Sequence, residues 1–381
     1  MSQLTVTRVL SRLALVLGMV LISGHFPSFS RRLANTLSPT GFMQNPRAGH
    51  TASLLPDGSV LIAGGFAGSG FERRPYISTE IFDPASGAFH PGPDMTAPHL
   101  GHAAVTLKDN RILLIGGWSA SGVTNTAEAY DPANHRFSAV GSMALARGEC
   151  TATLLQDGKV LVTGGVDQSD RALSSAEIFD PHTNSFSSAA SMMVPRSQHT
   201  ATLLRDGTVL TIGGGSCDCP SKSVYRAVEL YDPSVGKFIG VGSLSAARYK
   251  HTAVLLGDGN VFVAGGSDGR DWRGLLSSSE LYDPSSRSFQ PLPPMQASRF
   301  KFPHAALRLQ SGDVFIAGGA PFAELFRPKE RVFVTVTGGF EAAHYFASAT
   351  LLDDGRVLVV GGYSQVTGGL PATPRAWLYR P

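Results

Sequence analysis

The stretch Thr151-Ala-Thr-Leu-Leu-Gln-Asp-Gly-Lys-Val-Leu-Val-Thr-Gly-Gly165 decides the fold of this 381-residue chain, because it occurs seven times in related form. Each copy is an apolar run, a two-residue turn, a second apolar run and a closing pair of glycines. An Asp-Gly turn between two apolar runs predicts a β-hairpin, since a type I′ turn requires positive φ at both central residues. The other copies are Thr51–Gly65, Ala103–Gly117, Thr200–Gly214, Thr252–Gly266, Ala305–Gly319 and Ser348–Gly362.

The spacing of the copies predicts a β-propeller. Successive second glycines lie 43 to 53 residues apart, which is the length of one propeller blade. After each copy come a variable loop, a third strand ending in a motif such as Glu177-Ile-Phe-Asp-Pro181, and a fourth strand beginning near an aromatic residue such as Phe186. We therefore expect an all-β fold, a seven-bladed β-propeller of four-stranded antiparallel blades.

Both ends of the chain are expected to share the last blade. Its first three strands are predicted at Ser348–Leu352, Val357–Val360 and Ala376–Tyr379, and the chain ends at Pro381 before a fourth. Leu37–Met43 has the same pattern as the fourth strand Phe137–Met143, so it is expected to complete the blade. This closure leaves no open edge between the first and last blades.

These repeats resemble the kelch family of propellers. The resemblance rests on the apolar run before each glycine pair, the aromatic residue of the third strand, and the Met-x-x-x-Arg sequences Met192–Arg196 and Met295–Arg299. It covers about residues 37–381, although the fourth strands carry Phe where kelch repeats usually have Trp. The resemblance implies the fold. It also allows an enzyme, because some kelch-type propellers are copper radical oxidases of the galactose oxidase kind or sialic acid epimerases.

Composition and motifs narrow the functional classes. The net charge is +3, only 16% of residues are charged, and no basic run occurs, so we expect no nucleic-acid partner. The chain has no Gly-x-Ser-x-Gly, His-Glu-x-x-His or phosphate-binding loop. The oxidases use a further C-terminal domain, which this chain is expected to lack. We expect a monomer without a cofactor.

The first thirty residues predict export. Arg8 and Arg12 precede the ten apolar residues Leu13–Ile22, which suit a signal peptide and fall short of a membrane span. We expect residues 1–30 to be a signal peptide cleaved near Ser30, residues 31–381 to form one domain, and the protein to be periplasmic or extracellular. Arg31 and Arg32 leave an uncleaved N-terminal membrane anchor as the alternative.

Only three cysteines are present, Cys150, Cys217 and Cys219. The pair in Cys217-Asp-Cys219 predicts either a small loop disulfide or two idle thiols. Two thiols are too few for a structural zinc site, which needs four ligands.

The loops after the glycine pairs are expected to lie on one face, opposite the short Asp-Gly and Asp-Pro turns. They vary in length, which is typical of a binding surface. The predicted loops are Phe66–Ile77, Trp118–Asn125, Val166–Ser175, Gly215–Ala227, Ser267–Ser279, Tyr363–Arg375 and the short Ala320–Phe322.

A second periodic motif, Arg-x-x-His, precedes strand one on that face. Its members and variants are Arg47–His50, His99–His102, Arg147–Cys150, Arg196–His199, Arg248–His251, Arg299…His304 and His344 before Ala347. One interpretation is a cationic, histidine-rich cup around one mouth of the channel. The favoured interpretation is structural: each Arg pairs with the Glu of strand three, because buried charges require partners, and each His caps backbone at the channel wall. A metal site is not expected, since equivalent imidazoles around a ring need not converge on one ion.

The function expected from these features is a binding or scaffolding module for a protein or carbohydrate ligand on the long-loop face. The alternative is a carbohydrate-active enzyme, like an epimerase for an acidic sugar or an oxidase, acting at the channel mouth. No residue is proposed as catalytic. The candidate ligand-binding residues are Arg47, His50, His99, His102, Arg147, Arg196, His199, Arg248, His251, His304 and His344, with the aromatics Trp118, Trp272 and Tyr363, which are expected to be exposed.

Overall fold

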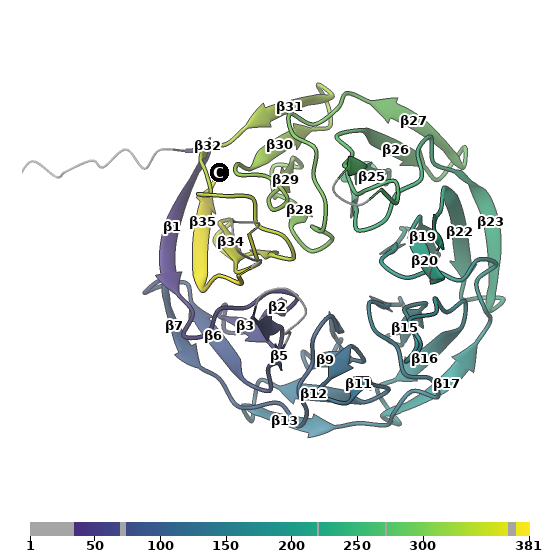
Figure 1. The fold of residues 1–381 in the computed structure, drawn as a ribbon, viewed down its shortest axis with the longest axis horizontal. Coiled ribbons are helices and arrows are strands. Elements are labelled where there is room, and N and C mark those ends of the chain that lie inside the picture. Colours follow the sequence, from purple (N-terminus) through teal and green to yellow (C-terminus); the bar gives the residue numbers. More distant parts are fainter. Residues whose placement is uncertain (1–33, 69–73, 219–220, 271–272, 365–370) are drawn as a thin grey trace, which may run out of the picture. The chain divides into compact units, whose positions relative to one another are not determined.

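The computed structural model describes residues 34–68, 74–218, 221–270, 273–364 and 371–381. The chain divides into two units, residues 1–33 and Ala34–Pro381, and the second is a ring of seven β-blades (Figure 1). The segment predicted to be a signal peptide lies outside the described residues. Within the described ranges, no helix has the length and hydropathy of a membrane span.

Six blades are four-stranded antiparallel sheets whose strands follow one another in sequence. Blade one contains β2 (Thr51–Leu54), β3 (Val60–Ala63), β6 (Thr79–Asp83) and β7 (Ala88–Pro91). Blade two contains β8 (Ala103–Thr106), β9 (Ile112–Ile115), β12 (Ala127–Asp131) and β13 (Arg136–Ala139). Blade three contains β14 (Thr151–Leu154), β15 (Val160–Thr163), β16 (Ala176–Asp180) and β17 (Ser185–Ala189).

The remaining blades follow the same order. Blade four contains β18 (Thr200–Leu203), β19 (Val209–Ile212), β22 (Ala227–Asp232) and β23 (Lys237–Ser243). Blade five contains β24 (Thr252–Leu255), β25 (Val261–Ala264), β26 (Ser279–Asp283) and β27 (Ser288–Leu292). Blade six contains β28 (Ala306–Arg308), β29 (Val314–Ile316), β30 (Glu324–Arg327) and β31 (Val332–Thr335). Blade seven contains β33 (Ser348–Leu351), β34 (Val357–Val360), β35 (Arg375–Arg380) and β1 (Thr36–Phe42).

The N-terminal strand closes the ring as predicted. In Figure 1 the purple β1 runs beside the yellow β35, and the two strands are antiparallel. Leu37 lies opposite Tyr379, which is the register that pairs Tyr130 with Phe137 in blade two. A short additional strand, β32 (Thr337–Gly338), pairs in parallel with the start of β1, so this blade has five strands rather than four.

The core lies between the blades. The second strand of each blade is buried along its whole length, as in β15 with Val-Leu-Val-Thr and β34 with Val-Leu-Val-Val. These strands contact a neighbouring blade on each side, which explains why their sequences are continuously apolar rather than alternating. Farther out, third- and fourth-strand aromatics pair across the sheet, as Phe179 and Phe186 do with ring centroids 5.0 Å apart.

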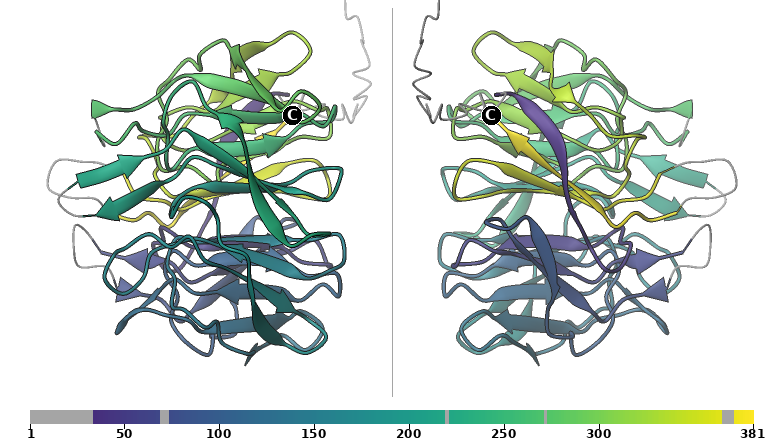
Figure 2. Two further views of the ribbon diagram at one scale, coloured as in Figure 1. Left: turned by 90° about the vertical axis from the view of Figure 1, so that its right-hand side faces the viewer. Right: turned by 90° about the vertical axis from the view of Figure 1, so that its left-hand side faces the viewer.

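Loops after the glycine pairs form the small hairpins β4–β5 (Phe66–Ala67 and Arg74–Pro75), β10–β11 (Trp118–Ser119 and Gly122–Val123) and β20–β21 (Gly215–Asp218 and Ser221–Val224). Figure 2 shows two of these hairpins, drawn in purple and in teal, projecting on the same side of the ring. We call this side the loop face and the opposite side the turn face.

We expect the closing strand to stabilise the whole propeller. Leu37→Ala should lower the free energy of unfolding by ~2–5 kcal/mol, because a 4%-exposed leucine is truncated against Tyr379. Phe42→Ala, on the same strand but 62% exposed, is the control and should change it by less than about 0.5 kcal/mol. Urea unfolding of both variants measures the difference. Equal, small effects would contradict closure by β1.

Candidate functional site

Neighbouring blades meet through the glycine pairs. The second glycine N–H of each blade donates to the carbonyl oxygen at the Arg position of the next blade, at 2.7–3.0 Å, and the last blade returns to Arg47. The first glycine has positive φ, and a Cβ on Gly213 would lie 2.5 Å from the Arg248 oxygen. Only glycine permits this approach, which fixes where the chain before strand one lies.

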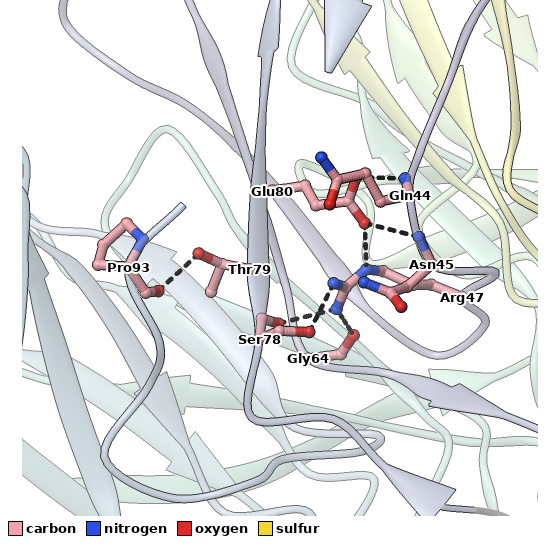
Figure 3. Close-up of polar contacts among 8 residues, drawn as sticks. All are labelled: Gln44, Asn45, Arg47, Gly64, Ser78, Thr79, Glu80 and Pro93. Carbon is pink, nitrogen blue, oxygen red and sulfur yellow. Dashed lines mark hydrogen bonds and ion pairs between the residues drawn. The ribbon is translucent and has the colours of Figure 1, made fainter. Parts of the chain in front are cut away.

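The Arg of each motif is a structural clamp. Figure 3 shows blade one, where Arg47 donates to Glu80, to the carbonyl oxygens of Gly64 and Ser78, and to the Ser78 hydroxyl. Glu80 also accepts from the amides of residues 44 and 45, just before Arg47. One buried ion pair thus holds the link from the preceding blade against strand three.

The clamp recurs in most blades, with all five arginines fully buried. The other pairs are Arg147–Glu177, Arg196–Glu229, Arg248–Glu280 and Arg299–Glu324, at 2.5–2.9 Å. The favoured structural interpretation of the arginines is confirmed. The alternative interpretation, a cationic cup at the channel mouth, does not apply to these arginines, because their guanidinium groups lie inside the blades and donate to buried carbonyl and carboxylate oxygens.

Two blades replace the ion pair. In blade two, His99 takes the place of Arg, with its Nε2 2.9 Å from Glu128 and its Nδ1 2.7 Å from the Gly116 oxygen. In blade seven, His344 and Trp377 stand at the Arg and Glu positions, and their rings lie in contact at a tilt of 53°, with centroids 4.7 Å apart. The same place in the fold accepts an Arg–Glu pair, a His–Glu pair or an aromatic pair.

The histidines of the motif bridge adjacent blades near the channel. In four blades the Nε2 atom lies 2.9–3.2 Å from hydroxyl oxygens on or beside the neighbouring blade's first strand, as for His50 with Ser348 and His251 with Thr200, and likewise for His102 and His199. The predicted backbone caps are therefore wrong, and the partners are hydroxyl groups. Burial, and secondarily the charge of Arg47, lowers the pKa of His50 to about 3. Burial and Arg196 do the same to His199, so these imidazoles are neutral near pH 7.

Blade six departs from the predicted register. Phe302 stands three residues after Arg299 and packs on Gly265, where other blades place the histidine. His304 lies farther along the chain and is exposed at the cavity described below. In blade three, Cys150 takes the histidine position, and burial raises the pKa of its thiol to about 11.

The residue just before each histidine position adopts a left-handed backbone. These residues are Gly49, Gly101, Glu149, Gln198, Lys250, Lys301 and Phe346, with φ between 52° and 62°. The amide of each donates to the carbonyl oxygen of the preceding one, and Gly49 donates to Phe346, at 2.7–3.3 Å. The seven bonds close into a circle, which we call the mouth ring. Five of its members are not glycine, and each accepts backbone strain of order 1 kcal/mol.

A cavity of about 110 Å³ lies at the mouth ring and is lined by residues from all seven blades. Phe66, Leu100 and Trp118 form its apolar wall. The indole of Trp118 lies against backbone, because a Cβ on Gly148 would be 2.6 Å from it and one on Gly101 would be 2.9 Å away. Four of the predicted histidines also line the cavity, namely His50, His102, His199 and His304.

The opposite part of the mouth ring is cationic and aromatic. The Lys250 ammonium lies 5.2–5.6 Å from the ring centroids of Tyr249, Phe300 and Phe346. Lys301 donates to the Tyr363 hydroxyl at 2.6 Å. Tyr363 is only 1% exposed, so its predicted exposure is wrong: it packs in a cluster with Phe66 and Tyr345.

Some sequence predictions fall outside the described part of the chain. Trp272 and Cys219 are not described, nor is the Cys217 side chain. Among the described residues, no group of three or more His, Cys, Asp or Glu side chains is placed to hold a metal ion. Of the histidines that line the cavity, His50 and His199 use Nε2 for hydroxyl partners.

The mouth ring was missed from the sequence. No single residue type occupies its seven positions, and the repeated Arg and His that flank them form the more obvious pattern. The available signal is one fixed position between two repeated residues at which the residue type differs among the blades.

We expect the clamp to matter for stability. Arg196→Ala should lower the free energy of unfolding by ~3–5 kcal/mol, because Glu229 would remain buried without its partner. Arg270→Ala is the control, since Arg270 forms an exposed pair with Asp268, and should change it by less than about 1 kcal/mol. Urea unfolding compares them. A loss below about 1 kcal/mol for Arg196→Ala would argue against the clamp.

The buried histidines predict acid sensitivity. Because the pKa of His199 is lowered to about 3, the unfolded chain binds a proton below pH ~6.5 that the folded chain does not. The free energy of unfolding should therefore fall as the pH drops through that window. Between pH 7 and 4.5 this fall should be ~2–3 kcal/mol smaller in His199→Gln, with the exposed His182→Gln as control. Urea unfolding at both pH values measures it, and an unchanged pH dependence in His199→Gln would refute this assignment.

Comparison with known proteins agrees with this architecture. The kelch motif model matches residues 99–144, 148–193 and 248–296. No curated protein sequence matches the chain. Among solved structures, a fungal alcohol oxidase of the AA5 family in complex with copper is similar, with a TM-score of 0.70 and 18% identity over 91% of this chain and 75% of that one. At this identity the likeness concerns the fold alone. With three matched repeats and seven blades, the chain is a kelch-repeat β-propeller.

Proposed function

We propose that this protein is a binding module whose ligand enters the axial cavity from the loop face. The observation that carries this proposal is the mouth ring, where five non-glycine side chains are kept in a strained backbone conformation beside a cavity. Strained residues concentrate at functional sites, because glycine would otherwise fill such positions at lower cost. In this ring only Gly49 and Gly101 do so.

The size of the cavity favours a protein ligand over a carbohydrate chain. At about 110 Å³ it is smaller than the several hundred Å³ usual for a drug-sized molecule. It suits one inserted side chain, while the hairpins of the loop face supply the surrounding contact area. Phe66, Leu100 and Trp118 provide the buried apolar contact that usually dominates binding free energy at such a point.

A carbohydrate-active enzyme at the same place has less support. Acid–base catalysis needs groups whose pKa lies near the working pH. Burial holds the pKa of His50 and His199 near 3, and Arg196 and Arg248 are enclosed in the clamps. The residues expected to bind or move protons on a sugar therefore have structural roles.

A second, larger hollow of about 570 Å³ lies on the turn face, beside Asp258, Lys329 and Glu330. Its lining residues include several exposed turn residues, and it lacks aromatic side chains. It therefore offers little apolar area for a ligand.

We also propose that the protein acts outside the cytoplasm. This proposal rests only on the signal-like residues 1–30. Mature protein from its native host should begin after Ser30, as N-terminal sequencing would reveal.

The placement on the loop face has a direct test. A panel of short peptides and of neutral and acidic sugars is titrated against the wild type and two variants. Trp118→Ala should weaken any ligand found by at least about tenfold, since it removes the largest apolar side chain of the cavity. Val235→Ala, at an exposed position of the turn face, should bind as the wild type does. Binding lost in Val235→Ala and kept in Trp118→Ala would reject this placement.

A further inference from the structure

Glu149 differs from the other glutamates near the channel. The strand-three glutamates are buried and held by Arg or His, as Glu177 is by Arg147. Glu149 is half-buried at the cavity, and its backbone is strained at a φ of 52°. Within the described part of the chain, its only side-chain hydrogen bond comes from the Gln198 amide. This carboxylate therefore has no cationic partner among the described residues.

Its surroundings hold the carboxylate in place. Gln198 is the next member of the mouth ring, and its Nε2 donates to one carboxylate oxygen of Glu149, while the other oxygen has no donor among the described residues. On the other side, a Cβ on Gly101 would lie 2.9 Å from the Trp118 indole and 3.9 Å from the Glu149 Cγ. The absence of a side chain at Gly101 thus leaves room for both the indole and the Glu149 side chain at this part of the cavity. This pairing attracts cations, through the ring quadrupole and through charge-assisted hydrogen bonds.

We propose that the axial cavity binds the cationic side chain of an arginine or lysine presented by a protein partner, with Glu149 as its counter-ion. Gln198 orients the carboxylate, and Trp118 covers the aliphatic part and the charged head of the inserted side chain. This inference rests on the proposed binding function and specifies the chemistry of its ligand.

Lys250 sets a limit on that ligand. It also lines the cavity, two blades from Glu149, and its ammonium lies over three aromatic rings. Because Lys250 places a positive charge at the same cavity, we expect a ligand with a single cationic group to bind and a second cation to be repelled. If the charge of Lys250 rather than that of Glu149 selected the ligand, acidic ligands would bind. The experiment therefore includes an acidic probe.

The test uses two probes of nearly equal shape. N-acetyl-arginine amide carries a guanidinium group, and N-acetyl-citrulline amide carries a neutral urea group in its place. Calorimetric titration of the full chain should give an affinity for the arginine probe at least about tenfold above that for the citrulline probe. Glu149→Gln should remove this preference, while Glu330→Gln, an exposed charge of the turn face, should preserve it. Thermal unfolding confirms that both variants are folded.

Three outcomes would overturn the inference: equal binding of the two probes, no binding of the arginine probe, or an unchanged preference in Glu149→Gln. Tighter binding of N-acetyl-glutamate amide than of the arginine probe would assign the cavity to acidic ligands through Lys250. In each case the proposed function still stands if another ligand binds and loses affinity in Trp118→Ala. If Trp118→Ala affects no ligand, the proposed function fails as well.

Discussion

The approach of one blade's glycine pair to the next blade's backbone is the contact on which the rest of this propeller depends. The second glycine donates its N–H to a carbonyl oxygen of the following blade, and the first has no side chain to obstruct that oxygen. Seven such bonds fix the distance between blades at the channel. The chain that follows each carbonyl must then turn sharply into strand one, and this turn creates the left-handed residues of the mouth ring.

The buried Arg–Glu pairs hold the backbone in the position that this contact between blades requires. An isolated arginine inside a protein would be expensive, but Arg248 is matched by Glu280 and by the carbonyl oxygens of Gly265 and Ser278. The clamp joins three parts of the fold, namely the link between blades, the glycine pair and strand three. The same buried ion pair therefore stabilises the fold and fixes the position of the link between blades. This also explains why blade seven could change both partners to His344 and Trp377 without opening the ring.

The mouth ring is where the repeats stop being equivalent. Each blade delivers one left-handed residue to the same circle, and the circle contains two glycines, an acid, an amide, two lysines and a phenylalanine. The glycine sector makes room for Trp118 and Leu100, and the lysine sector carries aromatic rings beneath its charges. A symmetric scaffold thereby holds an asymmetric cavity, with Glu149 and Lys250 on different blades.

Local sequence alone determined the number of blades, their strands and the closure of the ring. Asp-Gly turns, apolar runs and the match of Leu37–Met43 to Phe137–Met143 depend on neighbouring residues and on backbone geometry within one hairpin. Only the tertiary structure decided which side chains face the channel. The pairing of each Arg with a Glu of strand three was already expected from their repeated positions, as Arg196 and Glu229 show. In contrast, Phe302 replaces a histidine because blade six packs it on Gly265, and Glu149 reaches the cavity because Gly101 of the preceding blade leaves space. The positions of Phe302 and Glu149 are set by contacts between neighbouring blades, and no pattern within a single repeat encodes them.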